Sequence, residues 1–373
     1  MKILAINWQD LTNPQAGGAE VHLEEILKRV AARGHRVSLF CSSYPGARKT
    51  EWINGIEIIR KGSRYNFNFV VQKYIKSLIA SRNPDLVIED INKIPFYTPL
   101  FQNLPTLVAI PHLFADSVFK EINFVMGLYI FLSEKPIPNI YKGEKFMVIS
   151  DSTKDDLVRR NIPEQDVHVV KCGIDHALYC PDPDTRKSDP PLAVYVGRLK
   201  KYKTIDCLIR AMALVSEELP EARLVIVGDG DYAPKLVSLT RELKLKERVE
   251  FTGFVPQLEK VNWLRKAWVA IYPSLKEGWG LTNIEANACG TPVLASDVPG
   301  LRDSVSAGET GFLFEYGNTK KLAQLMVKVM SDSPLREKLV RGGLRWAQEF
   351  SWDKAADQTL ELCQMVVDEN KRR

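Results

Sequence analysis

The stretch PDPDTRKSDPP, residues 181–191, decides how this chain of 373 residues is organised. Its prolines fix φ and remove backbone donors, so neither a helix nor a strand can run through it. A length of 373 residues also exceeds what one ordinary α/β core needs. We therefore expect two domains, with this stretch as the linker between them.

Short apolar runs alternate with helical patterns on both sides of the linker. The expected strands before it are 3–7, 37–41, 56–60, 86–89, 106–110, 146–149 and 167–170. Those after it are 192–196, 223–227, 249–252, 269–272, 292–295 and 311–314, followed by a long terminal helix from 351 to about 367. Alternation of this kind predicts parallel sheets covered by helices. Because such sheets bind ligands at the carboxyl ends of their strands, we expect two Rossmann-like domains facing each other across a ligand-binding cleft.

The composition is that of a globular protein, with 45% hydrophobic and 26% charged residues. A net charge of +5 suits an anionic substrate and is too small to predict nucleic-acid binding. The six cysteines are scattered without C-x-x-C spacing, which favours reduced thiols in the cytoplasm. The first residues predict a strand and not a signal peptide. The apolar run 124–132 is shorter than the roughly 18 residues of a spanning helix; a buried helix is the simplest interpretation, and contact with a membrane surface or lipid is the alternative.

Two loops that follow expected strands carry features suited to phosphate binding. Gly17 and Gly18 precede a helix, where small residues and free amide groups favour an anion, although a tight turn would need glycine as well. Arg198 and Lys203 follow the strand 192–196 and could neutralise one diphosphate without a metal, although an exposed basic turn is the alternative.

A third loop, EGWGLTNIE at 277–285, contains two carboxylates on either side of a glycine-rich backbone. Glu277 and Glu285 could hold sugar hydroxyl groups while the amides between them bind phosphate oxygens. Thr282 and Glu285 also fit a capping box, which predicts that a helix begins there. A pure capping role for Glu285 is therefore the alternative.

Other polar residues are weaker candidates for a functional role. His112 follows the expected strand 106–110 and could hydrogen-bond a reacting sugar, or be structural. The other histidines are expected to be surface or packing residues. The D-x-D patterns at 182–184 and 229–231 could bind a metal, but we interpret both as turns.

Taken in order along nearly the whole chain, these motifs resemble those of the retaining GT-B glycosyltransferases of family GT4, also called group 1. The resemblance is carried by the segments 17–20, 112, 149–154, 173–175, 197–199 with 203, 228–230, 253–255, 277–285 and 290–293. The family motif commonly has Phe where this chain has Trp279, so the resemblance does not define the shape of the pocket at this position.

The resemblance implies a role for each matching residue. Arg198 and Lys203 would stabilise the donor diphosphate, and His112 would contact the transferring sugar. Donor binding would use Gly17 and Gly18 at the diphosphate, Phe254 and Val255 at the base, Glu285 at the ribose, and Glu277 with the amides of Gly278, Trp279, Gly280 and Leu281 at the sugar and phosphate.

The implied activity is transfer of a hexosyl group from a UDP- or GDP-sugar to a glycan, a lipid-linked or a small-molecule acceptor, with retention of configuration. We expect no metal and no cofactor beyond the donor, and a cytoplasmic enzyme that can attach peripherally to the inner membrane face. The expected domains are 1–185 on the acceptor side, 186–350 for the nucleotide sugar, and a helix at 351–373 that crosses back to the first domain.

Three other functions use similar sequence features. A phosphorylase or epimerase could share the fold, and a non-catalytic sugar-binding partner subunit could share the site. A dinucleotide-dependent oxidoreductase is disfavoured because no G-x-G-x-x-G motif follows the first strand.

Overall fold

The computed structural model of the protein describes residues 1–92, 94–113 and 124–372. Its internal contacts divide the chain into a first unit, Met1–Gly173 with Trp352–Arg373, and a second unit, Ile174–Ser351. This division differs from the expected boundary after residue 185. Residues 174–185 lie in the second unit because Arg265 donates to the carbonyl groups of Leu178 and Cys180.

The first unit is built on one sheet whose described strands lie in the order β3-β4-β2-β1-β5-β6-β7-β8. All neighbouring strands are parallel except the edge pair β3–β4, and β3 was not predicted from the sequence. β5 and β6 have no exposed residue, as expected when helices cover both faces of a parallel sheet. The strands are β1 (Lys2–Ile6), β2 (Arg36–Cys41), β3 (Thr50–Ile53), β4 (Ile56–Arg60), β5 (Leu86–Asp90), β6 (Thr106–Ile110), β7 (Lys145–Val148) and β8 (Val167–Val169).

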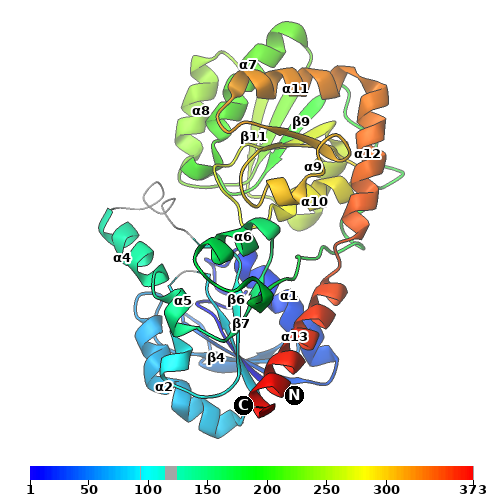
Figure 1. Ribbon diagram of the computed structural model, residues 1–373. Helices are drawn as coiled ribbons and strands as arrows, with labels where there is room; N and C mark the ends of the chain where they lie inside the picture. Colours follow the sequence, from blue (N-terminus) through cyan, green and yellow to red (C-terminus); the bar gives the residue numbers. More distant parts are fainter. Residues whose placement is uncertain (93, 114–123, 373) are drawn as a thin grey trace. The chain divides into compact units, whose positions relative to one another are not determined.

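Helices flank this sheet, and the end of the chain supplies one of them. The α-helices that the structure describes in this unit are α1 (Gly18–Ala32), α2 (Phe67–Arg82), α4 (Phe124–Glu134), α5 (Ile137–Ile140), α6 (Asp151–Arg159) and α13 (Trp352–Arg372). Figure 1 shows α13 beside α1, where Arg33 pairs with Asp353 at 3.2 Å and with Asp357 at 2.8 Å.

Helix α4 differs from its predicted setting. The apolar run 124–132 was expected to be buried, but side chains along α4 are exposed, including Phe124 at 69% and Val125 at 75%. No helix within the described ranges combines the length and the apolar character needed to cross a bilayer.

The second unit has a parallel sheet with strands in the order β11-β10-β9-β12-β13-β14. The strands are β9 (Leu192–Val196), β10 (Arg223–Val227), β11 (Val249–Gly253), β12 (Val269–Tyr272), β13 (Val293–Ser296) and β14 (Gly311–Phe314). Figure 1 shows α7 and α11 on one face of this sheet and α9 and α10 on the other. The helices are α7 (Ile205–Glu218), α8 (Ala233–Glu242), α9 (Gln257–Lys266), α10 (Leu281–Ala288), α11 (Thr319–Ser331) and α12 (Ser333–Gln348).

Candidate functional site

The winding of the second sheet reverses at β9. The chain proceeds from β9 to β10 and β11 on one side, then returns to place β12, β13 and β14 on the other. The carboxyl ends of β9 and β12 therefore form a topological switch point, where open α/β sheets bind ligands. Arg198 and Lys203 follow β9, and Glu277 follows β12, so three of the predicted site residues arise at this point.

The loop after β9 is held by backbone contacts to the loop after β10. The Leu199 amide donates to the Asp229 carbonyl at 2.9 Å, and the Tyr232 amide donates to the Leu199 carbonyl at 3.0 Å. A Cβ atom on Gly230 would lie 2.3 Å from the Leu199 carbonyl oxygen, so glycine is required at this close approach. Leu199 is buried and Arg198 is exposed. The D-x-D segment 229–231 is therefore a turn, as interpreted from the sequence. Its backbone contacts hold the Arg198 loop in position.

Lys203 and Glu277 form an ion pair between their ammonium and carboxylate groups. Both side chains are mostly buried, with 16% and 20% exposed. Burial alone would lower the pKa of the Lys203 ammonium, but the Glu277 carboxylate raises it above the usual value. The Leu275 amide also donates to the Tyr202 carbonyl at 2.9 Å, which ties the loops after β9 and β12 together. An arriving diphosphate would therefore meet a Lys203 that is charged and already paired.

The loop between Glu277 and α10 ends in a left-handed residue and not in a capping box. Gly280 has φ 78° and stands immediately before the helix, which begins at Leu281 without a side-chain cap. The predicted Thr282–Glu285 box is therefore wrong, because the backbone turns at Gly280 before either side chain could act as a cap. A Cβ atom on Gly300 would lie 2.2 Å from the Glu277 carbonyl oxygen, so the loop after β13 supports this backbone closely. The first amides of α10 lack acceptors within the helix and can bind an anion.

Glu285 is a buried carboxylate whose partner was not predicted from the sequence. Lys260 on α9 lies 2.7 Å from its Oε2 atom and also donates to the Tyr179 hydroxyl at 2.9 Å. Burial raises the pKa of Tyr179, and the nearby Glu285 raises it further. A carboxylate that is 6% exposed needs a cation, but no sequence spacing marks Lys260 as that cation.

Phe254 and Trp279 have opposite environments. Phe254, in the loop after β11, is 86% exposed, and Val255 beside it is half-buried, so the Phe254 ring is open to a ligand. Trp279 is 3% exposed and its ring lies 5.4 Å from that of Phe350. The Trp279 side chain therefore belongs to the packing of the second unit, and a ligand in this loop would meet its backbone.

The first unit has a switch point of its own between β1 and β5. Gly17 stands before α1 and Gly18 begins it, and the Glu20 carboxylate accepts hydrogen bonds from the Gly17 amide at 2.7 Å and from Asn92 at 3.1 Å. A Cβ atom on Gly18 would meet nothing within 4 Å. His112 follows β6 and is half-buried. The structure thus gives Gly17 a carboxylate partner, Glu20, at the anion-favouring end of the helix.

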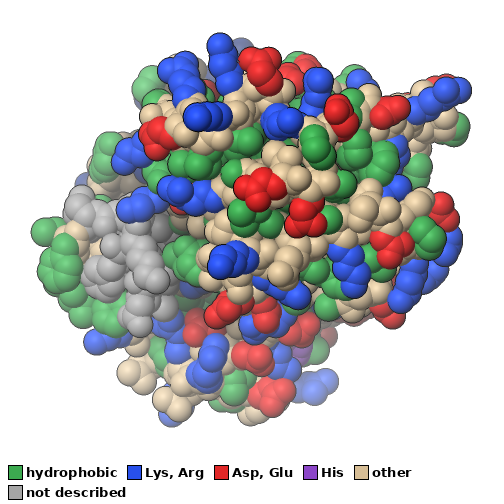
Figure 2. Space-filling model, turned by 90° about the horizontal axis from the view of Figure 1, so that it is seen from above, with side chains coloured by type: hydrophobic (Ala, Val, Ile, Leu, Met, Phe, Trp, Pro, Cys, Tyr) green, Lys and Arg blue, Asp and Glu red, His purple; other side chains and the backbone are tan. Residues whose placement is uncertain are grey.

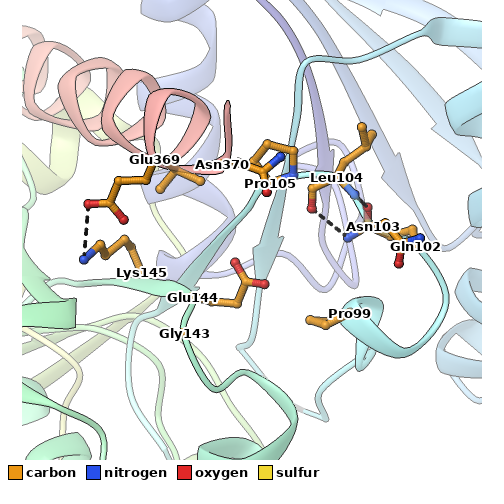
Figure 3. Close-up of a pocket in the computed structure, with 11 residues that line it drawn as sticks. Pro99, Gln102, Asn103, Leu104, Pro105, Gly143, Glu144, Lys145, Glu369 and Asn370 are labelled. Atoms are coloured by element: carbon orange, nitrogen blue, oxygen red, sulfur yellow. Dashed lines mark hydrogen bonds and ion pairs between the residues drawn. The ribbon is translucent and has the colours of Figure 1, made fainter. Parts of the chain in front are cut away.

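A separate pocket of about 220 Å³ lies in the first unit (Figure 3). Residues at the starts of β6 and β7 line it together with the end of α13, and Lys145 pairs with Glu369 at 3.5 Å on its edge. It therefore lies at the amino ends of these strands and includes no predicted site residue. Among the residues that the structure describes, no three His, Cys, Asp or Glu side chains gather as a metal site would require.

The structure is that of an α/β protein with two Rossmann-like units, in which two basic side chains, a carboxylate and the amino end of a helix come together at the switch point of the second unit. A family model described as Glycosyltransferase Family 4 matches residues 16–178, and one described as Glycosyl transferases group 1 matches residues 182–346. The chain belongs to this family of glycosyltransferases.

Individual proteins agree with this assignment. The D-inositol 3-phosphate glycosyltransferase of Thermomonospora curvata is 34% identical over 218 residues, which cover 52% of this chain and 51% of that protein. The chain thus spans about half the length of such curated relatives. Sucrose-phosphate synthase from Thermosynechococcus elongatus has a TM-score of 0.83 at 24% identity and covers 99% of both chains. HepE from Anabaena, solved with UDP and glucose, has a TM-score of 0.77 at 18% identity over 98% of this chain and all of its own. The fold is therefore GT-B.

Proposed function

We propose that this protein is a retaining hexosyltransferase that uses a UDP- or GDP-sugar as donor. The observation that carries the proposal is the group of charges and amides at the β9–β12 switch point. Arg198, the Lys203–Glu277 ion pair and the amino end of α10 all arise from two adjacent loops. Cations, helix amides and a carboxylate are the groups that a diphosphate and a sugar need.

The chemistry assigned to these residues is stabilisation of the leaving nucleoside diphosphate. Arg198 supplies a fork of donors and Lys203 a point charge, so negative charge that develops on the departing phosphate is compensated where it forms. On donor binding the Lys203 ammonium would share its hydrogen bonds between the phosphate and Glu277, and Glu277 would accept from a sugar hydroxyl group. The rate acceleration then comes from protein charges that are already in place and from correct positioning of the donor and acceptor, without a metal ion.

The remaining roles follow the same assignment. Phe254 and Val255 contact the base, and Glu285, held by Lys260, binds the ribose. In the first unit the proposal assigns Gly17 and Gly18 to the diphosphate and His112 to the transferring sugar. The acceptor is a glycan, a lipid-linked or a small molecule, and the enzyme works in the cytoplasm with peripheral attachment to the inner membrane face.

A thermal-shift panel of UDP-, GDP- and ADP-sugars tests the donor class. A bound donor raises the unfolding temperature by mass action, and about 100-fold excess over Kd adds about 2.7 kcal/mol. We expect a UDP- or GDP-sugar to produce this shift and then to support acceptor glycosylation with retained anomeric configuration. A flat panel, or turnover that depends on inorganic phosphate, would reject the transferase assignment.

A further inference from the structure

Helix α4 exposes an apolar surface that carries no charge. Phe124, Val125, Met126, Leu128, Tyr129 and Leu132 all have large exposed fractions. Tyr129 and Glu134 are the only ionisable residues in this helix. Glu134 is buried, and its carboxylate lies 3.6 Å from the Arg160 guanidinium. An exposed helix surface made of large apolar side chains marks an interaction site.

The start of α2 extends this surface. The Asn68 side chain donates to the Tyr129 hydroxyl at 3.1 Å, which places the beginning of α2 against α4. Two aromatic side chains near this contact are exposed, Tyr65 at 84% and Phe69 at 61%. Figure 1 shows both helices on the same side of the first unit, and Figure 2 shows hydrophobic side chains gathered beside the grey residues. We define the α2–α4 surface by Tyr65, Phe69, Phe124, Val125, Leu128 and Leu132.

The rim of the α2–α4 surface has one sign of charge. No acidic residue occurs between Glu57 and Asp85, whereas Lys61, Arg64, Lys73 and Lys76 are exposed in that interval. The Lys61 ammonium stands 3.6 Å from the ring centre of Tyr74. Lys135, just after α4, is also exposed. Apolar and aromatic side chains beside lysine and arginine are the pattern of elements that lie in the interface of a bilayer.

We propose that the α2–α4 surface docks on a bilayer of anionic lipids, with the α4 side chains in the boundary between headgroups and acyl chains. The lysines and Arg64 bind the headgroups, each strengthening attachment about fivefold. A second copy of the chain fits less well, because it would bring two basic rims together. The inference rests on the membrane attachment in the proposed function. It adds that the α2–α4 surface makes the contact and that the lipids are anionic.

Flotation of the full chain with lipid vesicles tests this proposal. We expect binding to vesicles of phosphatidylcholine with about 30% phosphatidylglycerol, at least tenfold weaker binding to phosphatidylcholine alone, and release as salt approaches about 1 M. Val125→Asp and the pair Lys73→Glu/Lys76→Glu should each weaken binding about tenfold or more. The matched controls, Leu258→Asp on α9 and Lys320→Glu/Lys321→Glu on α11, should bind as the unchanged protein does.

Several outcomes overturn the proposal. These are absent vesicle binding, equal binding to both vesicle types, and binding that survives Val125→Asp. Self-association that Val125→Asp abolishes, without vesicle binding, would assign the surface to a second copy instead. Thermal shifts with nucleotide sugars on the same preparations keep the two hypotheses apart, since lost vesicle binding with retained donor binding rejects only the membrane surface.

Discussion

Lys203 and Glu277 are 74 positions apart in the sequence, yet their side chains form one ion pair. Both residues were predicted site residues, but they were assigned to different parts of the donor. Their contact means that the charge of Lys203 is held in place before a ligand arrives. Glu277 therefore has two roles in our account: it raises the pKa of Lys203 and accepts from the sugar.

Replacement of Glu277 by Gln tests this double role. The variant loses the carboxylate that favours a charged Lys203 and one charged acceptor, so we expect kcat/KM for the donor to fall about 10- to 100-fold. The unfolding temperature should fall as well, because Lys203 is left mostly buried without its carboxylate partner, so activity is compared at a temperature where the variant is still folded. Asp231→Asn, which removes the partner of Lys200 in the neighbouring loop, is the matched control and should retain activity. Equal activity of both variants would contradict the assignment.

The Lys260–Glu285 pair leads to a prediction about stability. Lys260→Met would leave a buried carboxylate without its cation, which costs about 3 kcal/mol of unfolding free energy. The double variant Lys260→Met/Glu285→Gln should recover most of this loss, because no buried charge then remains. Urea denaturation of both variants measures the difference. A double variant no more stable than the single one would show that the pair is not coupled.

Among the strands, the apolar runs were the strongest signal where a parallel strand is buried on both faces, as β5, β6, β9 and β12 are. β3 was missed because its residues, TEWI, alternate between exposed and half-buried, which is the pattern of an edge strand. The start of α10 was misassigned because Thr282 and Glu285 match a capping box by spacing, while the backbone turns at Gly280. Local spacing could not reveal that turn, since it depends on support from the Gly300 loop.

The contact between the loops after β9 and β10 predicts the effect of one methyl group. In Gly230→Ala the new Cβ would lie 2.3 Å from the Leu199 carbonyl oxygen, so the loops must separate. We expect a loss of about 1–3 kcal/mol in unfolding free energy and weaker UDP binding, because Arg198 moves with its loop. Gly18→Ala, where the Cβ would meet open space, should be nearly neutral in the same unfolding measurement. Similar losses in both variants would contradict the prediction.

For the complete chain, alternation of strands and helices predicted two Rossmann-like units but not their strand order. The adjacency of β9 to β12, and of β1 to β5, fixes which loops meet, and it depends on long-range packing. The partners Lys260 and Asn92 could not be predicted for the same reason. The glycines and charges of the candidate site could be selected from the sequence, since their chemistry is local to each loop, and their contact with a ligand stays a prediction.

The stability of the chain should depend on pH through His22. Burial lowers the pKa of His22 to about 4, against 6.5 for an exposed histidine. Between these values the unfolded chain binds a proton that the folded chain does not, so stability falls as pH drops from about 6.5 to about 4, by about 3 kcal/mol. His22→Leu should remove this part of the slope in urea denaturation across the range. An unchanged slope would show that His22 does not cause it.

Our proposal requires that fixed protein cations at the β9–β12 switch point hold the donor diphosphate without a metal. The test is calorimetric titration of UDP and GDP in the presence of a chelator. It is done on the unchanged protein, on Arg198→Ala and on Lys201→Ala, which removes an exposed cation of the same loop. We predict chelator-resistant binding of one of the two nucleotides that Arg198→Ala weakens about 10- to 100-fold and Lys201→Ala leaves intact. Binding that requires a divalent cation, or that is equally strong in all three proteins, would contradict the account.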